Sequence, residues 1–218
     1  MVGAKLLVKN DAEKLATILS EHYKDAHYYL NFKTPIDLMV AAIISAQTRD
    51  EVVNKVTPSL FAKYKTSKDY ANANVDELVG QIKSVSFAGN KAKNIINACK
   101  ILVEKYNGKV PNKMEELIEL PGIGRKTANT ILINAYGIVE GIPVDTWVIK
   151  LSYRLGLSQN NDPDKIEEDL KSKIPKRNWI KFAYVLKTHG KQICQTIPYC
   201  SKCPVNSLCP KNEVSKRH

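Results

Sequence analysis

The sequence predicts an all-α protein, and two observations lead to this fold class. Apolar residues recur at three- and four-residue intervals through most of the chain, and prolines, glycines and capping residues separate the periodic segments. The alternating pattern of strands is missing, as are long linkers and internal repeats. With 218 residues, the chain is long enough to bury a sizeable core as one domain or as two small ones.

The first two helices are expected near the N-terminus. One runs through about Tyr23, and Asn10 and Glu13 are predicted to form a capping box at its start. The next opens at Thr34, has a proline in its first turn, and is apolar on all sides over residues 38–44. This second segment is therefore predicted to be a core helix.

Two residues that follow early helices each have two possible roles. Gln47 comes directly after the apolar run and is either a cap-region loop residue or a group directed into a cleft. Phe87 follows a short helix predicted over residues 75–82. It is either an anchor in the core, which is the usual fate of phenylalanine, or an exposed wedge. The local sequence does not decide between these alternatives.

The later helices begin and end at recognisable residues. Asp145 precedes one of them and is most simply explained as its N-cap. Gly190 is expected to end the last one. The predicted segments are residues 91–106, 147–155, 163–173 and 177–189.

A glycine-rich turn joins two helical segments within residues 114–136. Pro121 stops the first segment, Gly122 and Gly124 permit positive φ angles, and the second segment starts near Arg125. Backbone N–H groups at such a helix N-terminus are suited to hold a phosphate. An ordinary αα-hairpin is the alternative. A dinucleotide-binding fingerprint is excluded, because it needs a third glycine and a preceding strand.

Lys126 distinguishes this hairpin from a purely structural one. It falls in the first turn of the second segment, where the positive end of the helix dipole disfavours a cation. A lysine that loses its proton is a nucleophile. Lys126 is therefore a candidate catalytic residue.

The charge of the chain points to a polyanionic partner. There are 33 Lys and Arg residues against 22 Asp and Glu residues, which gives a net charge of +11. A solvated lysine-rich surface is the alternative. No apolar segment approaches the roughly 18 residues of a membrane span, and the N-terminus lacks the apolar core of a signal peptide. We therefore expect an intracellular, soluble protein.

Four of the five cysteines lie in the last 25 residues, at Cys194, Cys200, Cys203 and Cys209. In a reducing compartment such a cluster indicates a metal site rather than disulfides. Structural zinc usually shows two C-x₂-C pairs, whereas this run has one, and four nearby thiolates suit an iron–sulfur cluster. Zinc and a redox pair remain the alternatives.

Taken together, these segments resemble the endonuclease III family of base excision DNA glycosylases. The resemblance extends from about Pro35 to Cys209. It rests on residues 44–50, 120–128 and 144–146, together with the four-cysteine tail. Four such segments in this order are far more specific than any one of them.

The resemblance implies a fold of two helical domains. One is a six-helix barrel over about 28–138, which contains the helix-hairpin-helix motif at 114–136. The other is discontinuous, is made of residues 1–27 and 139–218, and carries a 4Fe-4S cluster held by the four cysteines. DNA is expected to bind across the cleft between the two domains.

The resemblance also implies a bifunctional DNA glycosylase and AP lyase, with Lys126 as the nucleophile and Asp145 as the essential carboxylate. The implied substrate is double-stranded DNA with an oxidised pyrimidine or an abasic site, bound by a monomer after the damaged base leaves the stack. The lysine attacks C1′, and the resulting Schiff base permits β-elimination on the 3′ side.

Further residues are implied to contact DNA. Gln47 corresponds to a residue that fills the space left by the flipped base, and Phe87 to an apolar wedge near the opposite strand. Phosphate contacts are implied for the hairpin residues and for one lysine of the cysteine segment: Gly122, Gly124, Arg125 and Lys202.

Three features depart from the family pattern. The first cysteine interval, of five residues, is one shorter than usual. Trp147 stands where a histidine often follows Asp-Thr, and the loop over residues 86–89 differs from the common form, which leaves the range of lesions open.

Two rival functions remain. A mismatch thymine or uracil glycosylase shares the fold but usually lacks the lysine at position 126. A non-catalytic helix-hairpin-helix module with a zinc-stabilised tail would make Lys126 and Asp145 coincidental.

Overall fold

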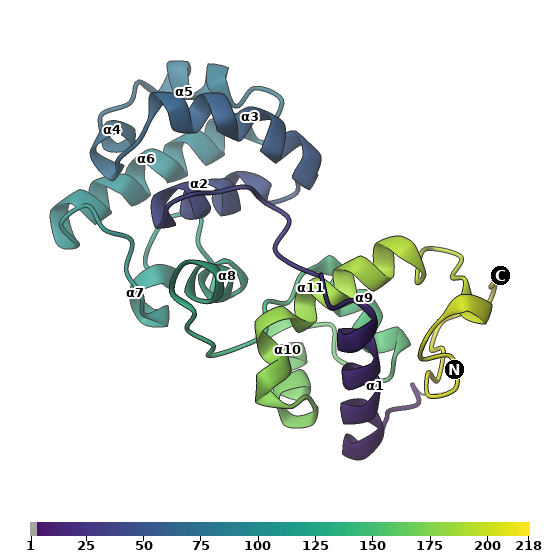
Figure 1. Ribbon diagram of the computed structural model, residues 1–218. Helices are drawn as coiled ribbons and strands as arrows, with labels where there is room; N and C mark the ends of the chain where they lie inside the picture. Colours follow the sequence, from purple (N-terminus) through teal and green to yellow (C-terminus); the bar gives the residue numbers. More distant parts are fainter. Residues whose placement is uncertain (1–3) are drawn as a thin grey trace. The chain divides into compact units, whose positions relative to one another are not determined.

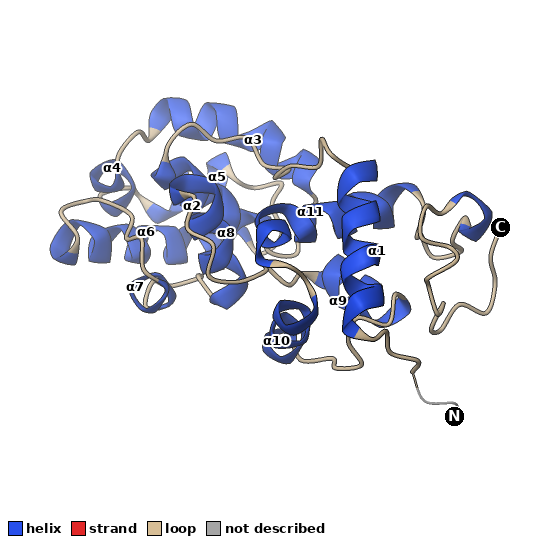
Figure 2. Cartoon of the chain, turned by 60° about the horizontal axis from the view of Figure 1, so that its bottom comes forward, coloured by secondary structure: helices blue, strands red, loops and turns tan. Residues whose placement is uncertain are grey.

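The structure, a computed structural model, describes residues 4–218. Over these residues it contains eleven α-helices and one short 3-10 helix, without any strand (Figures 1 and 2). The predicted all-α fold class is therefore confirmed. The helices form two compact units. We call them the central unit, Tyr29–Ile138, and the terminal unit, which combines Val139–His218 with the N-terminal segment through Tyr28.

The central unit is organised around one buried helix. Its helices are α2 (Pro35–Ser45), α3 (Asp50–Lys63), α4 (Ser67–Ala71), α5 (Val75–Gln81), α6 (Ala88–Lys105), α7 (Met114–Ile118) and α8 (Arg125–Tyr136). Every residue of α2 from Ile36 to Ile44 is buried, and α2 packs against α3, α6 and α8 (Figure 1). Thr34 and Asp37 form a reciprocal capping box at its start. The prediction of a core helix that opens at Thr34 is confirmed.

The terminal unit brings the two ends of the chain together. Its helices are α1 (Lys9–His22), α9 (Thr146–Arg154), α10 (Pro163–Lys173) and α11 (Lys176–Gln192), followed by the 3-10 helix η1 (Cys200–Lys202). Both α1 and α9 pack against α10 and α11. Fully buried side chains such as Leu15, Leu151 and Phe182 form the core between them. The N–H of Leu7 also donates to the Gly156 carbonyl at 2.8 Å.

Two helices start at residues other than those predicted. The N-cap of α1 is Val8, which makes no side-chain cap, so the capping box predicted at Asn10 is wrong. The backbone hydrogen bond from Leu7 to Gly156 holds the chain just before α1, and the helix begins two residues later, at Lys9. Helix α6 starts at Ala88, three residues earlier than predicted, because Phe87 adopts a left-handed conformation as its N-cap. No described helix has both the length and the apolar character that crossing a membrane requires.

Candidate functional site

The hairpin turn lies between α7 and α8 in the central unit. Gly122 has φ +84°, a conformation that favours glycine, and a Cβ there would lie 3.1 Å from Nδ2 of Asn94 on α6, which is a tight contact. Gly124 has φ −98° and is the N-cap of α8, so the expectation that it too needs a positive φ is wrong. Both glycines are exposed, and Gly124, the N-cap of α8, has no side chain that could cap the helix.

Lys126 lies in the first turn of α8 and is half-buried. Its backbone is well supported, because the Lys126 carbonyl accepts a bond from Thr130 Oγ1 at 3.0 Å and the residues from Ala128 to Ile133 are buried. Helix α8 packs against α2 and α7. Arg125, also half-buried, precedes Lys126 at the helix start. The helix that carries the candidate nucleophile is thus packed into the core of the central unit.

Asp145 belongs to the terminal unit, where it is the N-cap of α9. Its Oδ1 accepts hydrogen bonds from the N–H groups of Trp147 and Val148, both at 2.9 Å. The residues before it, from Gly141 to Val144, are buried, whereas Asp145 is half-buried. The N-cap prediction is confirmed, and the two bonds fix the direction of the carboxylate.

Trp147 anchors the start of α9 within the terminal unit. The sequence predicts that Gly190 ends the last helix, but this residue lies inside α11. A Cβ at Gly190 would lie 2.3 Å from Cε3 of Trp147. The indole therefore packs directly on the α11 backbone, and Lys150 Nζ lies 5.4 Å from its ring centroid. This contact holds the helix turn that Asp145 caps.

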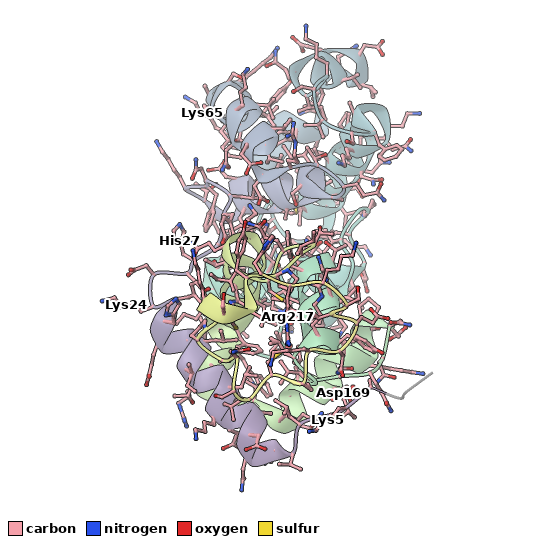
Figure 3. The ribbon with its side chains drawn as sticks, turned by 90° about the vertical axis from the view of Figure 1, so that its right-hand side faces the viewer. Lys5, Lys24, His27, Lys65, Asp169 and Arg217 are labelled. Atoms are coloured by element: carbon pink, nitrogen blue, oxygen red, sulfur yellow. The ribbon has the colours of Figure 1, made fainter. Side chains whose placement is uncertain are left out.

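The four C-terminal cysteines line one pocket of the terminal unit, together with Arg154 and His189. All four are free thiols. Figure 3 looks onto the C-terminal segment that carries Cys200 and later residues, with Arg217 labelled near its end. Burial raises the pKa of Cys194 and Cys203, and raises that of Cys209 to about 11. The four cysteines, which the sequence predicts to be ligands of one metal centre, thus share one pocket.

Arg154 and His189 support this pocket, and neither was singled out from the sequence. Arg154 Nη1 lies 3.7 Å from Cys194 Sγ, and the guanidinium also donates to the carbonyls of Cys194, Gln195 and Thr196. His189 Nε2 lies 3.8 Å from Cys203 Sγ. Burial lowers the pKa of His189 to about 4. A charged residue within the apolar stripe of α9 was the available signal for Arg154.

Three predicted DNA contacts lie at exposed positions. Gln47 and Phe87, both in the central unit, have φ angles of +52° and +58°, which few residues other than glycine adopt. Phe87 is 64% exposed, so the wedge alternative fits the structure and the core anchor does not. Lys202 is exposed in η1, and its Nζ lies 5.9 Å from the centroid of the Tyr199 ring.

The structure joins the Gln47 and Phe87 segments through residues that the sequence analysis missed. Ser86 N–H donates to Thr48 Oγ1 at 3.2 Å, and the ammonium of Lys91 donates to the same oxygen at 3.0 Å. Burial lowers the pKa of Lys91. The sequence contains one sign that Lys91 is buried: it lies on the same face of the helix as the apolar residues Ile95 and Ala98.

Residues 40–176 match the family model of the HhH-GPD superfamily base excision DNA repair proteins. This match defines the general class to which the hairpin and the all-helical fold belong. Endonuclease III of Synechocystis sp. is 44% identical over 95% of this chain and 95% of its own length. Endonuclease III of Bacillus subtilis is 40% identical over 89% of this chain and 90% of its own length.

Solved structures give the same result. A trapped covalent endonuclease III–DNA intermediate is 38% identical and superposes with a TM-score of 0.90, over 94% of this chain and 97% of that one. A thermostable thymine-DNA glycosylase, 23% identical with a TM-score of 0.82 over 94% of this chain and 98% of its own, shares the fold. The chain therefore belongs to the endonuclease III family of DNA glycosylases with AP lyase activity, which act in base excision repair.

Proposed function

We propose that this protein removes oxidised pyrimidines from double-stranded DNA and then cleaves the strand 3′ to the abasic site. The observation that carries the proposal is Lys126 in the first turn of α8, directly after the exposed hairpin turn. A phosphate held by the N–H groups of this turn would bring the sugar of a flipped nucleotide to the lysine. We infer that the substrate is chromosomal DNA, which a monomer meets inside the cell.

Lys126 would act as the nucleophile of both reactions. Its neutral amine attacks C1′, the C1′–N bond breaks, and the base leaves with the bonding electrons and takes up a proton. Opening of the sugar ring gives a Schiff base between Lys126 and C1′. This cation acidifies the 2′-hydrogen, and loss of that proton expels the 3′-phosphate. Water then releases Lys126 from the sugar fragment.

Asp145 would supply negative charge while the glycosidic bond breaks. Positive charge develops on the sugar in that step, and a carboxylate of fixed direction stabilises it without reorganisation. The bonds from Trp147 and Val148 to Oδ1 provide this fixed direction.

The exposed residues of the central unit would keep the substrate open. Gln47 would occupy the space that the damaged base leaves, and Phe87 would insert as an apolar wedge beside the opposite strand. Phosphate contacts are assigned to Gly122, Gly124, Arg125 and Lys202. Such contacts hold the duplex without reading its sequence.

We propose that the four cysteines hold a 4Fe-4S cluster rather than zinc. The four thiols line one pocket, and their segment has a single C-x₂-C pair, whereas structural zinc usually shows two such pairs. The cluster would hold together the C-terminal segment that carries Lys202.

Borohydride trapping on a duplex with one thymine glycol tests the proposed reaction. We expect a covalent protein–DNA adduct, because borohydride reduces the Schiff base to a stable amine. The undamaged duplex is the control and should give none. Free base without an adduct would indicate a monofunctional mismatch glycosylase. Neither adduct nor base release would contradict the proposed substrate.

Metal analysis of the purified protein tests the assignment of the cluster. We expect about four iron and four sulfide per chain. Cys203→Ser should lower the iron content, whereas Cys99→Ala, a buried cysteine of the central unit outside the pocket, should leave it unchanged. One zinc per chain in place of iron would contradict the assignment.

A further inference from the structure

Lys91 is a buried lysine in the first turn of α6, and its side chain is directed to the end of another helix. Only 6% of the residue is exposed. Its ammonium donates to the carbonyls of Ile44, at 2.9 Å, and Ala46, and to Thr48 Oγ1 at 3.0 Å. All three acceptors lie at or just beyond the C-terminus of α2. The function proposed above makes no use of this group.

Part of this arrangement is a helix cap. The last carbonyls of a helix lack partners within it, and the C-terminal end of the helix dipole favours a cation. Burial of an ammonium group is unfavourable unless hydrogen bonds compensate it. The bonds to Ile44 and Ala46 meet this requirement. A cap for α2, however, would need only these two carbonyls.

The third bond connects two loops. Thr48 Oγ1, which accepts from Lys91, also accepts from the N–H of Ser86 at 3.2 Å. The backbone N–H of Lys91 donates to the Phe87 carbonyl at 3.1 Å. Lys91 therefore contacts both neighbours of Gln47 and the backbone of Phe87.

Gln47 and Phe87 both have unfavourable backbone conformations. Gln47 and Phe87 have positive φ angles, which persist only where surrounding contacts impose them. On either side of Gln47, the Ala46 carbonyl and Thr48 Oγ1 accept hydrogen bonds from the Lys91 ammonium, and the N–H of Thr48 donates to the Ser45 carbonyl at 3.0 Å. The Lys91 ammonium thus supports the Gln47 segment directly, and it reaches the Phe87 segment through the Thr48 oxygen that Ser86 also contacts.

We propose that Lys91 is a positioning residue that holds the Gln47 and Phe87 loops in the conformation that enters the opened duplex. This inference rests on the proposed function, in which these two side chains stabilise the flipped state. Lys91 would therefore affect removal of a base from duplex DNA. It would not affect the chemistry of Lys126, which acts at the sugar.

Two reactions of the same protein separate these effects. One is single-turnover removal of thymine glycol from a duplex, which requires base extrusion and filling of the gap. The other is cleavage of single-stranded DNA at an abasic site, which requires neither of these steps and uses Lys126 as its nucleophile. The variant Lys91→Met keeps the apolar part of the side chain and removes the ammonium. Lys100→Met, at an exposed position on the same helix, is the matched control.

For Lys91→Met we expect duplex excision to slow by about tenfold to a hundredfold, the size expected when hydrogen bonds to a charged group are lost. The rate of single-strand cleavage should change by less than about twofold, because sites that do not interact affect each other's free energies by no more than this. Lys100→Met should leave both rates unchanged. An equal fall in both reactions would assign Lys91 a general structural role, and no fall in either would also overturn the proposal.

A double-mutant cycle tests whether Lys91 acts through Gln47. In a Gln47→Ala background, the effect of Lys91→Met on duplex excision should shrink to about threefold or less. Full additivity would contradict the proposal. If Lys91→Met does not fold, as judged by thermal denaturation, Thr48→Val leaves Lys91 in place and removes the hydroxyl that accepts from Lys91 and Ser86 and donates to the Ala46 carbonyl at 3.4 Å. It should reduce duplex excision selectively, and an unchanged ratio of the two rates would overturn the inference.

The wild-type measurement separates this inference from the proposed function. Wild type that excises thymine glycol, with Lys91→Met equally active, would contradict the inference alone. Wild type without excision would contradict the proposed function itself.

Discussion

Replacing Lys126 with alanine is expected to abolish strand cleavage at an abasic site in duplex DNA. The single-turnover rate should fall at least about a thousandfold, because no other group can form the Schiff base that makes the 2′-hydrogen acidic. The helix should remain intact, since alanine is a good helix former and the supporting residues of α8 are buried behind it. Gel separation of a 5′-labelled duplex, with enzyme in excess, measures the rate.

Lys126→Arg provides the matched control for charge. Arginine keeps the positive charge beside the hairpin but stays protonated and is not a nucleophile. We expect it to bind abasic DNA within about threefold of wild type, as measured by fluorescence anisotropy, yet to cleave as poorly as Lys126→Ala. Cleavage by either variant at the wild-type rate would place the nucleophile elsewhere.

Asp145→Asn is expected to slow removal of the damaged base by about a hundredfold to a thousandfold. The change removes the negative charge that stabilises the developing cation, a contribution of the size measured for other groups that stabilise transition-state charge. Asparagine caps helices about as well as aspartate, so the bonds from Trp147 and Val148 should survive. Single-turnover release of thymine glycol measures the rate, and DNA affinity should change by less than about threefold.

Asp162→Asn is a matched control in the same unit. Asp162 caps α10 as Asp145 caps α9, accepting with Oδ1 from the N–H groups of Asp164 and Lys165. Both variants should keep the wild-type melting temperature within a few degrees, as expected for exchange of equivalent caps. Only Asp145→Asn should lose excision. An unchanged excision rate for Asp145→Asn would assign the role of the essential carboxylate to another residue.

Local sequence determined most of the helices. The capping box at Thr34 and Asp37, the aspartate caps at residues 145 and 162, and the left-handed Gly137 after α8 act within one turn of chain. Such signals are legible without knowledge of the fold, because both partners are near neighbours. The apolar run of α2 likewise predicted its burial.

Some residues of the candidate site were predicted from local motifs, and others only from the resemblance to a family. The hairpin, Lys126 and the cysteine cluster are contiguous motifs, so their residue types and spacing already indicated their chemistry. Gln47, Phe87 and Lys202 were named by resemblance, and their roles in DNA binding stay predictions. The structure adds that all three are exposed and that two of them have strained backbones.

The sequence by itself determined the fold class, the hairpin and the order of the motifs, because these depend on short-range periodicity and turn chemistry. Only the tertiary structure decided that Phe87 is exposed, that α6 starts at Ala88 and that α1 needs no side-chain cap. It also decided the contacts of Lys91 with α2 and of Gly190 with Trp147. Each of these contacts joins residues more than forty positions apart, and no local pattern in a single sequence records such a pairing.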